Sequence, residues 1–105
     1  MLVMMAMKHS PETCPAYNSK YRDMSVKWFE NVGSIAAKYG VKFVNSWTDH
    51  PMHTLYALFD TQSMDNMMKL AMDPEMSVGM AFNKIRTFPV MDHQQTLAIV
   101  KQSTG

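Results

Sequence analysis

The sequence has little of what defines several large classes of protein. It has one cysteine, Cys14, which excludes an internal disulfide and is compatible with a reducing compartment. Ten basic and nine acidic residues give a net charge of +1, and the basic residues form no run. This balance offers no electrostatic attraction for nucleic acid or for an acidic membrane surface. We therefore expect neither of them as a partner.

The motifs of several enzyme classes are also missing. The four glycines stand apart from one another, so no glycine-rich phosphate loop is present. The sequence contains no Gly-x-Ser-x-Gly elbow and no His-Glu-x-x-His zinc motif. Nucleotide hydrolysis, α/β-hydrolase chemistry and iron–sulfur binding therefore have little support, and we expect no cofactor.

Long apolar runs are absent as well. The first seven residues are apolar, but Lys8 and His9 end that run, whereas a membrane span needs about 20 apolar residues. A secretory signal would carry its charge before the apolar stretch rather than after it. We expect a cytoplasmic protein of one domain, residues 1–105, whose 47% of apolar residues can form a modest core.

The first half of the chain predicts a strand followed by a long helix. Residues 2–7 form a short apolar run typical of a buried strand, and residues 10–20 are rich in turn formers. Asn18 or Ser19 can cap a helix over residues 19–39, and Gly40 suits its C-terminal end. The residues on the apolar face of this helix recur at spacings of three and four: Tyr21, Met24, Trp28, Val32, Ile35 and Tyr39.

The second half predicts a hairpin, a shorter helix and a fourth strand. Strands over 41–48 and 53–59 flank a turn at 49–52, and a helix begins near Met64 and ends before Asp73-Pro74. A loop or a short turn of helix over 75–80 then leads to a strand over 81–90. Asp92 and Gln95 resemble a capping box, which favours a helix over 93–102; the alternative is a fifth, edge strand.

This order of elements predicts an α+β fold of the ferredoxin-like β-α-β-β-α-β kind. Right-handed crossovers place the first and third strands at the centre of a four-stranded antiparallel sheet with helices on one face. The strands carry large apolar side chains on both faces, so the open face needs a cover, and a second copy of the sheet is the simplest one. We therefore expect a homodimer. The apolar pairs are Met4 and Met5, Tyr56 and Phe59, and Phe82 and Ile85.

The element order, the length and the uncovered sheet resemble the dimeric α/β-barrel superfamily. That superfamily includes small monooxygenases, isomerases and haem-handling proteins, so the resemblance implies a fold and a dimer without fixing a reaction. Two stretches also resemble a small, uncharacterised bacterial and archaeal group: Met5-Ala-Met-Lys-His-Ser-Pro-Glu-Thr-Cys-Pro and His53-Thr-Leu-Tyr-Ala-Leu-Phe-Asp.

In this topology one end of the sheet collects most of the chemically active side chains. The C-terminal ends of the first two strands meet the N-terminal ends of the last two, which brings three imidazoles, a thiol, a carboxylate and a phenol together. We predict His9 and His53 as catalytic residues because imidazole titrates near neutral pH. The predicted ligand-binding residues are Cys14, Tyr17, Trp47, Asp49, His50 and Tyr56.

Three interpretations of this cluster compete. The first, which we favour, is a cavity for a small apolar, aromatic or polyketide-like molecule, in a cofactor-independent monooxygenase or isomerase if the protein is an enzyme. The second is a non-catalytic binding or sensing module for a metal or a haem-like ligand, in which His9, Cys14 and His53 could hold a transition metal such as zinc or copper. The third is a structural dimer with ordinary loop-end residues. The pair His50 and His53 alone is a poor metal motif, because Pro51 lies between them in a turn.

Overall fold

The structure is a computed structural model that describes residues 1–103, except for the side chains of residues 78–80 and 103. Its four strands and its helices follow one another in the predicted ferredoxin-like order, so the predicted α+β fold is confirmed. The elements are β1 (Leu2–Lys8), the 3₁₀ helix η1 (Pro11–Thr13), α1 (Ser19–Ala37), β2 (Lys42–Asp49), β3 (Thr54–Asp60), α2 (Met64–Ala71), α3 (Pro74–Met80), β4 (Lys84–Val90) and α4 (His93–Ser103).

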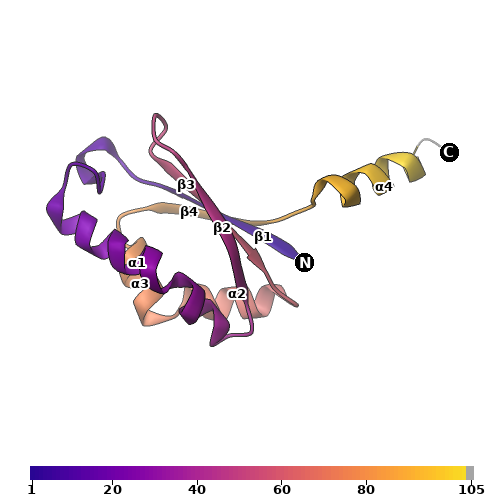
Figure 1. Cartoon of the computed structure of the whole chain (residues 1–105), viewed down its shortest axis with the longest axis horizontal. Coiled ribbons are helices and arrows are strands. Elements are labelled where there is room, and N and C mark those ends of the chain that lie inside the picture. Colours follow the sequence, from indigo (N-terminus) through magenta and orange to yellow (C-terminus); the bar gives the residue numbers. More distant parts are fainter. Residues whose placement is uncertain (104–105) are drawn as a thin grey trace.

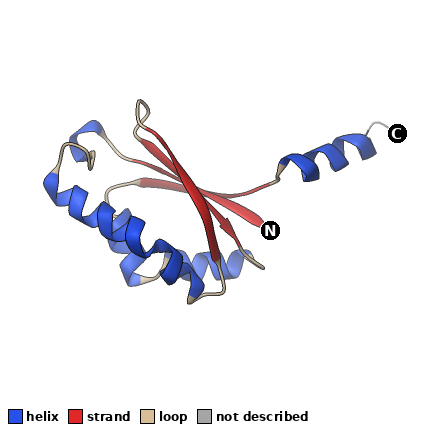
Figure 2. Ribbon diagram, viewed as in Figure 1, coloured by secondary structure: helices blue, strands red, loops and turns tan. Residues whose placement is uncertain are grey.

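The sheet has the strand order β2-β3-β1-β4, and every neighbouring pair is antiparallel. The first and third strands therefore lie at the centre, as predicted. Helices α1, α2 and α3 lie on one side of the sheet, whereas α4 extends away from it beyond the end of β4 (Figures 1 and 2). The C-terminal helix thus leaves the opposite face of the sheet uncovered within this chain.

Alternate residues of β1 separate the two faces of the sheet. Val3 and Met5 are fully buried and Met7 is nearly so, whereas Met4 and Ala6 are partly exposed on the face that carries no helix. The sequence left this choice of face open, because both sets are apolar. The residues of the buried core are Val3, Met5, Met7, Trp28, Val32, Ile35, Ala36, Val41, Ala57, Phe59, Met67, Leu70 and Met76.

Helix α1 is fixed at both ends by local hydrogen bonds. The side chain of Asn18 accepts from the backbone N–H groups of Lys20 and Tyr21, at 3.1 and 3.4 Å, and so caps the first turn. The helix ends at Ala37, two residues before the predicted end, because the chain tightens into a turn that finishes at Gly40 with φ of +69°.

Residues 75–80, for which a loop or a short turn of helix was predicted, belong to the complete helix α3. Pro74 begins it, and the Asp73 carboxylate accepts hydrogen bonds from the backbone N–H groups of Glu75 (2.9 Å) and Met76 (3.4 Å). Proline is favoured at a first helical position, and Asp at the cap before it. The dipeptide that ends α2 therefore also starts α3.

Strands β3 and β4 start later than the sequence predicts, as β2 also does by one residue. His53 lies in the turn before β3 with φ of +50°, a conformation that cannot continue a strand, and its N–H donates to the His50 carbonyl (3.0 Å). Strand β4 starts at Lys84 rather than at Ala81. These shifts leave His53 and Phe82 in connecting segments. Their side chains therefore need not follow the alternation between the two faces of the sheet that holds within a strand.

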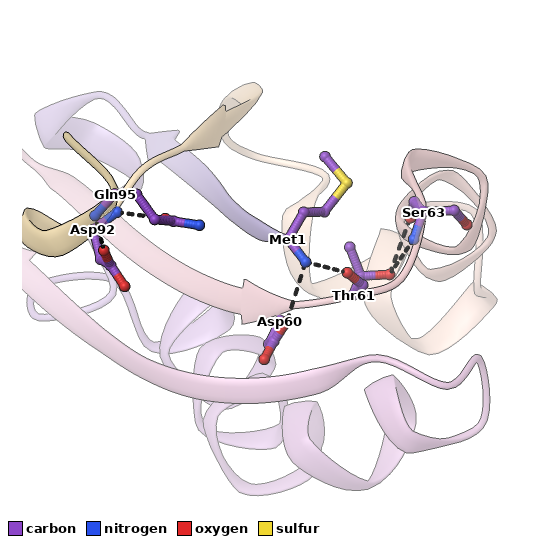
Figure 3. A network of polar contacts seen from close by, with 6 residues as sticks. All are labelled: Met1, Asp60, Thr61, Ser63, Asp92 and Gln95. Atoms are coloured by element: carbon purple, nitrogen blue, oxygen red, sulfur yellow. Dashed lines mark hydrogen bonds and ion pairs between the residues drawn. The ribbon is translucent and has the colours of Figure 1, made fainter. Parts of the chain in front are cut away.

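The predicted capping box at the start of α4 is present. The backbone N–H of Asp92 donates to the Gln95 side chain (2.9 Å), and the Gln95 N–H donates back to the Asp92 carboxylate (2.8 Å), as Figure 3 shows. The helix is therefore confirmed, and the alternative of a fifth strand is wrong. In the same view, the N-terminal amine of Met1 donates to the Thr61 carbonyl (2.7 Å), which holds the start of β1 beside the end of β3.

The position of α4 makes the chain elongated. Its principal extents are 55 × 32 × 18 Å and its radius of gyration is 15.3 Å, compared with about 13 Å for a compact domain of this length. None of the described side chains of α4 belongs to the buried core, and Leu97 is 39% exposed. Within residues 1–103, no helix combines the length and the apolar character needed to cross a membrane.

Candidate functional site

The imidazoles of His9 and His53 meet at the end of β1. The backbone N–H of His9 donates to the His53 carbonyl (3.1 Å), which extends the pairing of β1 with β3 by one residue into the turn. The two ring centroids are 5.3 Å apart with an interplanar angle of 74°, an edge-to-face arrangement. The positive φ of His53 turns the chain at this point. The two predicted catalytic residues therefore lie side by side.

The loop after β1 brings Cys14 to the same place. Helix η1 begins at Pro11, and its turn closes when the Cys14 N–H donates to the Pro11 carbonyl (3.3 Å). The Cys14 carbonyl then accepts from Asn18 (3.0 Å), the residue that caps α1. The Cys14 side chain is only 2% exposed. One ligand atom from each of His9, Cys14 and His53 lies within 4.8 Å of the other two.

The electrostatics of this cluster favour a neutral His9. Burial lowers the pKa of His9 below its usual value of 6.5, and the neighbouring His53 and His50 lower it further. A side-chain hydrogen bond with Asn83 acts in the opposite direction. The lowered pKa favours the neutral form of His9, which has a lone pair on one ring nitrogen.

Two buried ring nitrogens of this cluster are not satisfied by the protein. Nε2 of His9 and Nδ1 of His53 have no hydrogen-bond partner among the described residues. Burying a polar atom without a partner costs on the order of 1–3 kcal/mol, so most buried polar groups are paired. Two such atoms lie close together here, where they are available to a water molecule, a ligand or an ion.

A pocket with a volume of about 190 Å³ opens beside these side chains, between the sheet and α1. Its polar lining residues are His9, Cys14, His50, Thr54 and Asn83, around the histidines, together with Ser25 of α1 and Thr48 of β2. A cavity of about 150 Å³ accommodates benzene, whereas typical drug-sized ligands need roughly 300–1,000 Å³. The volume of the pocket is therefore large enough for a molecule with a single ring. Its apolar walls are formed by Met7, Trp28, Phe29, Leu55 and Phe82.

Of three other predicted site residues, His50 lines the pocket, whereas Tyr17 and Asp49 do not. His50 is exposed but lines the pocket, and its ring centroid is 5.8 Å from that of His53. Tyr17 is 75% exposed, with its ring centroid 6.3 Å from that of His50. The Asp49 carboxylate accepts a hydrogen bond from the Met52 N–H (3.2 Å) and so holds the hairpin turn. Their placement gives His50 direct access to the pocket and Asp49 a structural role in the turn.

The structure does not bring Trp47 and Tyr56 to this pocket. They are opposite one another across β2 and β3, on the sheet face that carries no helix, whereas the adjacent pair Thr48 and Leu55 lines the pocket. Trp47 is 50% exposed and Tyr56 is 37% exposed. Neighbouring residues of a strand point to opposite faces, which explains the separation.

Several pocket residues carried no functional prediction. The Phe82 ring lies 6.1 Å from His9 and 4.6 Å from Tyr21 by centroid distance, so it closes the space between the end of β1 and α1. Asn83, the next residue in the chain, makes a side-chain hydrogen bond with His9 that opposes the lowering of the His9 pKa. Both precede β4 at the end of the sheet where the histidines gather. The predicted topology was therefore sufficient to predict where these two residues lie, but not what they do.

These features define the class of the protein: a ferredoxin-like α+β domain with a small pocket between its sheet and its first helix. The chain belongs to the family described as Domain of unknown function (DUF3303), whose model matches residues 1–104. It is also similar to a solved structure titled as an uncharacterized NIPSNAP domain protein from Burkholderia xenovorans. That likeness has a TM-score of 0.49 and 14% sequence identity, and covers 89% of this chain and 97% of the other. No curated protein matches the chain.

Proposed function

We propose that the protein is a homodimeric binding domain for a small apolar or aromatic molecule, which lies in the pocket between the sheet and α1. The observation that carries this proposal is the pocket itself, with mostly apolar walls and a small number of polar groups, including His9 and Cys14. Ligand sites commonly combine apolar walls with a small number of placed polar groups. The volume of about 190 Å³ selects single-ring molecules.

The unsatisfied polar atoms around the pocket indicate what the molecule carries. Trp28 lines the pocket, and its indole N–H is buried without a partner among the described residues, as are the ring nitrogens of His9 and His53. A hydroxyl or carbonyl group on the ring would satisfy such groups. We therefore propose a phenol-like or cyclic carbonyl compound as the ligand class.

His9 and His53 are the proposed proton-transfer groups if the bound molecule is turned over. The neutral His9 ring accepts a proton from an acidic carbon or hydroxyl of the ligand, and the pair returns it at a second position. Isomerisation needs only these two transfers, so its atoms balance without a cofactor. Monooxygenation, the other reaction of the predicted class, also consumes molecular oxygen as a co-substrate.

The homodimer is proposed from the face of the sheet that carries no helix. Its central and edge strands offer a continuous set of apolar side chains, and Arg86 lies over the Phe88 ring at 4.4 Å. A second copy of the same face would cover it, and sheets pack in this way in many proteins. The elongated shape supports this occupant, because α4 extends beyond its own core to where a partner would lie. The apolar residues of this face are Leu2, Met4, Trp47, Tyr56, Leu58, Phe88 and Val90.

The two tryptophans provide a direct test of ligand binding, because one lines the pocket and the other lies on the opposite face. In the Trp47→Phe variant only Trp28 reports, and phenol is expected to change its fluorescence in a saturable way. The matched Trp28→Phe variant retains Trp47 and should show no saturable change. If phenol, toluene and cyclohexanone all leave the Trp28 signal unchanged in folded protein, the proposal is wrong.

A further inference from the structure

We propose that His9, Cys14 and His53 together bind one zinc-like transition-metal ion, at the polar end of the pocket. The inference goes beyond the proposed ligand binding, because the ion is held by three protein side chains whatever molecule enters the pocket. It rests on the proposed function only for the identity of the fourth ligand, which would be a water molecule or an oxygen atom of the bound molecule.

The geometry of the three side chains is close to that of a metal site. Zinc bonds of about 2.0–2.1 Å to nitrogen and about 2.3 Å to sulfur place tetrahedral ligand atoms roughly 3.3–3.6 Å apart. The ligand atoms of the three residues lie within 4.8 Å of one another. Closing this gap requires the ligand atoms to approach one another by at most about 1.2–1.5 Å, which rotation of the imidazoles about their side-chain bonds can supply.

The unsatisfied nitrogens are an independent observation that points to an ion. Nε2 of His9 and Nδ1 of His53 are buried and have no hydrogen-bond partner among the described residues. Each lies on a ring that belongs to the three-residue cluster. A metal ion is electron-poor and binds such lone pairs directly, so one ion would remove both of these costs.

The donor set selects the kind of metal. Two imidazoles and one thiolate suit zinc, copper or nickel, whereas magnesium and calcium require carboxylate or carbonyl oxygens. The nearby Asp49 carboxylate is occupied by the hairpin turn. Three protein ligands leave a fourth position open, which is the pattern of zinc sites that act on a substrate. Because both His9 and Cys14 line the pocket, that position is accessible from it.

Metal binding and proton transfer use the same lone pairs, so they exclude one another in a single molecule. When the ion binds, the Cys14 thiol loses its proton to the solvent and its sulfur bonds to the metal. His9 and His53 then hold the ion rather than a proton. The ion in turn polarises an oxygen atom of the molecule in the pocket.

The test is a titration of the tag-free, metal-stripped full chain with Zn²⁺, followed by calorimetry and by competition with a chromophoric chelator. We expect one Zn²⁺ per chain, and at least a tenfold loss of affinity in each of Cys14→Ser, His9→Gln and His53→Asn. Asparagine tolerates the backbone conformation of position 53. His93→Gln, on α4, is the control and should bind like the wild-type protein. Co²⁺ should give a thiolate charge-transfer band that Cys14→Ser abolishes.

The outcomes separate this inference from the proposed function. Failure of the folded wild-type chain to bind Zn²⁺, or binding that survives Cys14→Ser and His9→Gln unchanged, overturns the metal site. Far-ultraviolet circular dichroism identifies any variant that does not fold, and His9 and His53, both partly exposed, give variants with less effect on packing than the buried Cys14. The phenol titration with Trp47→Phe is run without metal, so its result decides the pocket proposal separately.

Discussion

The hydroxyl of Tyr39 donates a hydrogen bond to the carboxylate of Asp73, which caps α3, and so ties the end of α1 to the start of α3. This contact changes both acidities. The hydrogen bond from Tyr39 is the main cause of a lowered Asp73 pKa, helped by the N–H groups of the cap and opposed by burial. The same bond raises the Tyr39 pKa above 10.0. The pair therefore couples the packing of two helices to pH.

The first prediction is that Tyr39→Phe weakens the pH dependence of stability. A lowered Asp73 pKa stabilises the fold above the unfolded value near 3.8, and this stabilisation is lost as the pH falls through the folded value. A raised Tyr39 pKa stabilises the fold below about 10.0, and this is lost as the pH rises through the folded value. Urea unfolding at acidic, neutral and alkaline pH measures both slopes.

Tyr21→Phe, elsewhere on α1, is the control for that experiment. It should leave the loss of stability at acidic pH unchanged. Tyr39→Phe, in contrast, should lower the stability most at neutral pH, so that stability changes less with pH on both the acidic and the alkaline side. Lys38 and Glu75 also face this pair, so each variant is compared at matched ionic strength. Identical pH profiles for the two variants would show that the hydrogen bond does not contribute.

Two glycines are predicted to respond in opposite directions to replacement by alanine. Gly40 has φ of +69°, so Gly40→Ala should lower the free energy of unfolding by about 1–2 kcal/mol. Gly33 lies inside α1, and an added methyl group would meet nothing within 4 Å. Gly33→Ala should therefore raise the free energy of unfolding by about 0.5–1 kcal/mol. Chemical denaturation of both variants measures these two changes. Equal shifts in the free energy of unfolding would contradict the left-handed backbone conformation of Gly40 at the end of α1.

The homodimer predicts that a charge placed on the open sheet face produces monomers. In Tyr56→Glu the carboxylate would be buried between two sheets without a partner, at a cost of several kcal/mol. Sedimentation velocity should then show a monomer at concentrations where the wild-type chain is a dimer. Val26→Glu, at an exposed apolar residue of α1, makes the same change away from the interface and should remain dimeric. A wild-type chain that is monomeric at high concentration would remove the proposed interface.

Strand directions allowed the main grouping of the site to be predicted. Because β1 and β2 end where β3 and β4 begin, His9, Cys14 and His53 could be expected at one end of the sheet without any coordinates. The face of each strand residue could not be predicted, because β1 is apolar at both Met4 and Met5. This ambiguity is why Trp47 and Tyr56 were expected near the histidines although they lie on the opposite face.

The remaining differences come from local backbone conformations that outweigh strand patterns. His53 adopts a positive φ because the hairpin turn closes there. The pattern of apolar residues along the chain does not indicate such a conformation. Phe82 lies before β4 rather than in it, so its side chain can close the pocket. The cap at Asp73 was read as the end of one helix, and only its hydrogen bonds to Glu75 and Met76 identify it as the start of the next.

Chemical-shift mapping of phenol on the isotope-labelled chain tests most simply whether the pocket between the sheet and α1 binds a ligand. A ligand in this pocket should produce saturable changes at the backbone amides of the lining residues Met7, Cys14, Leu55 and Phe82. Val44, exposed on β2 away from the pocket, should not respond. Changes confined to the open sheet face, or none at saturating phenol, would contradict a ligand site between the sheet and α1.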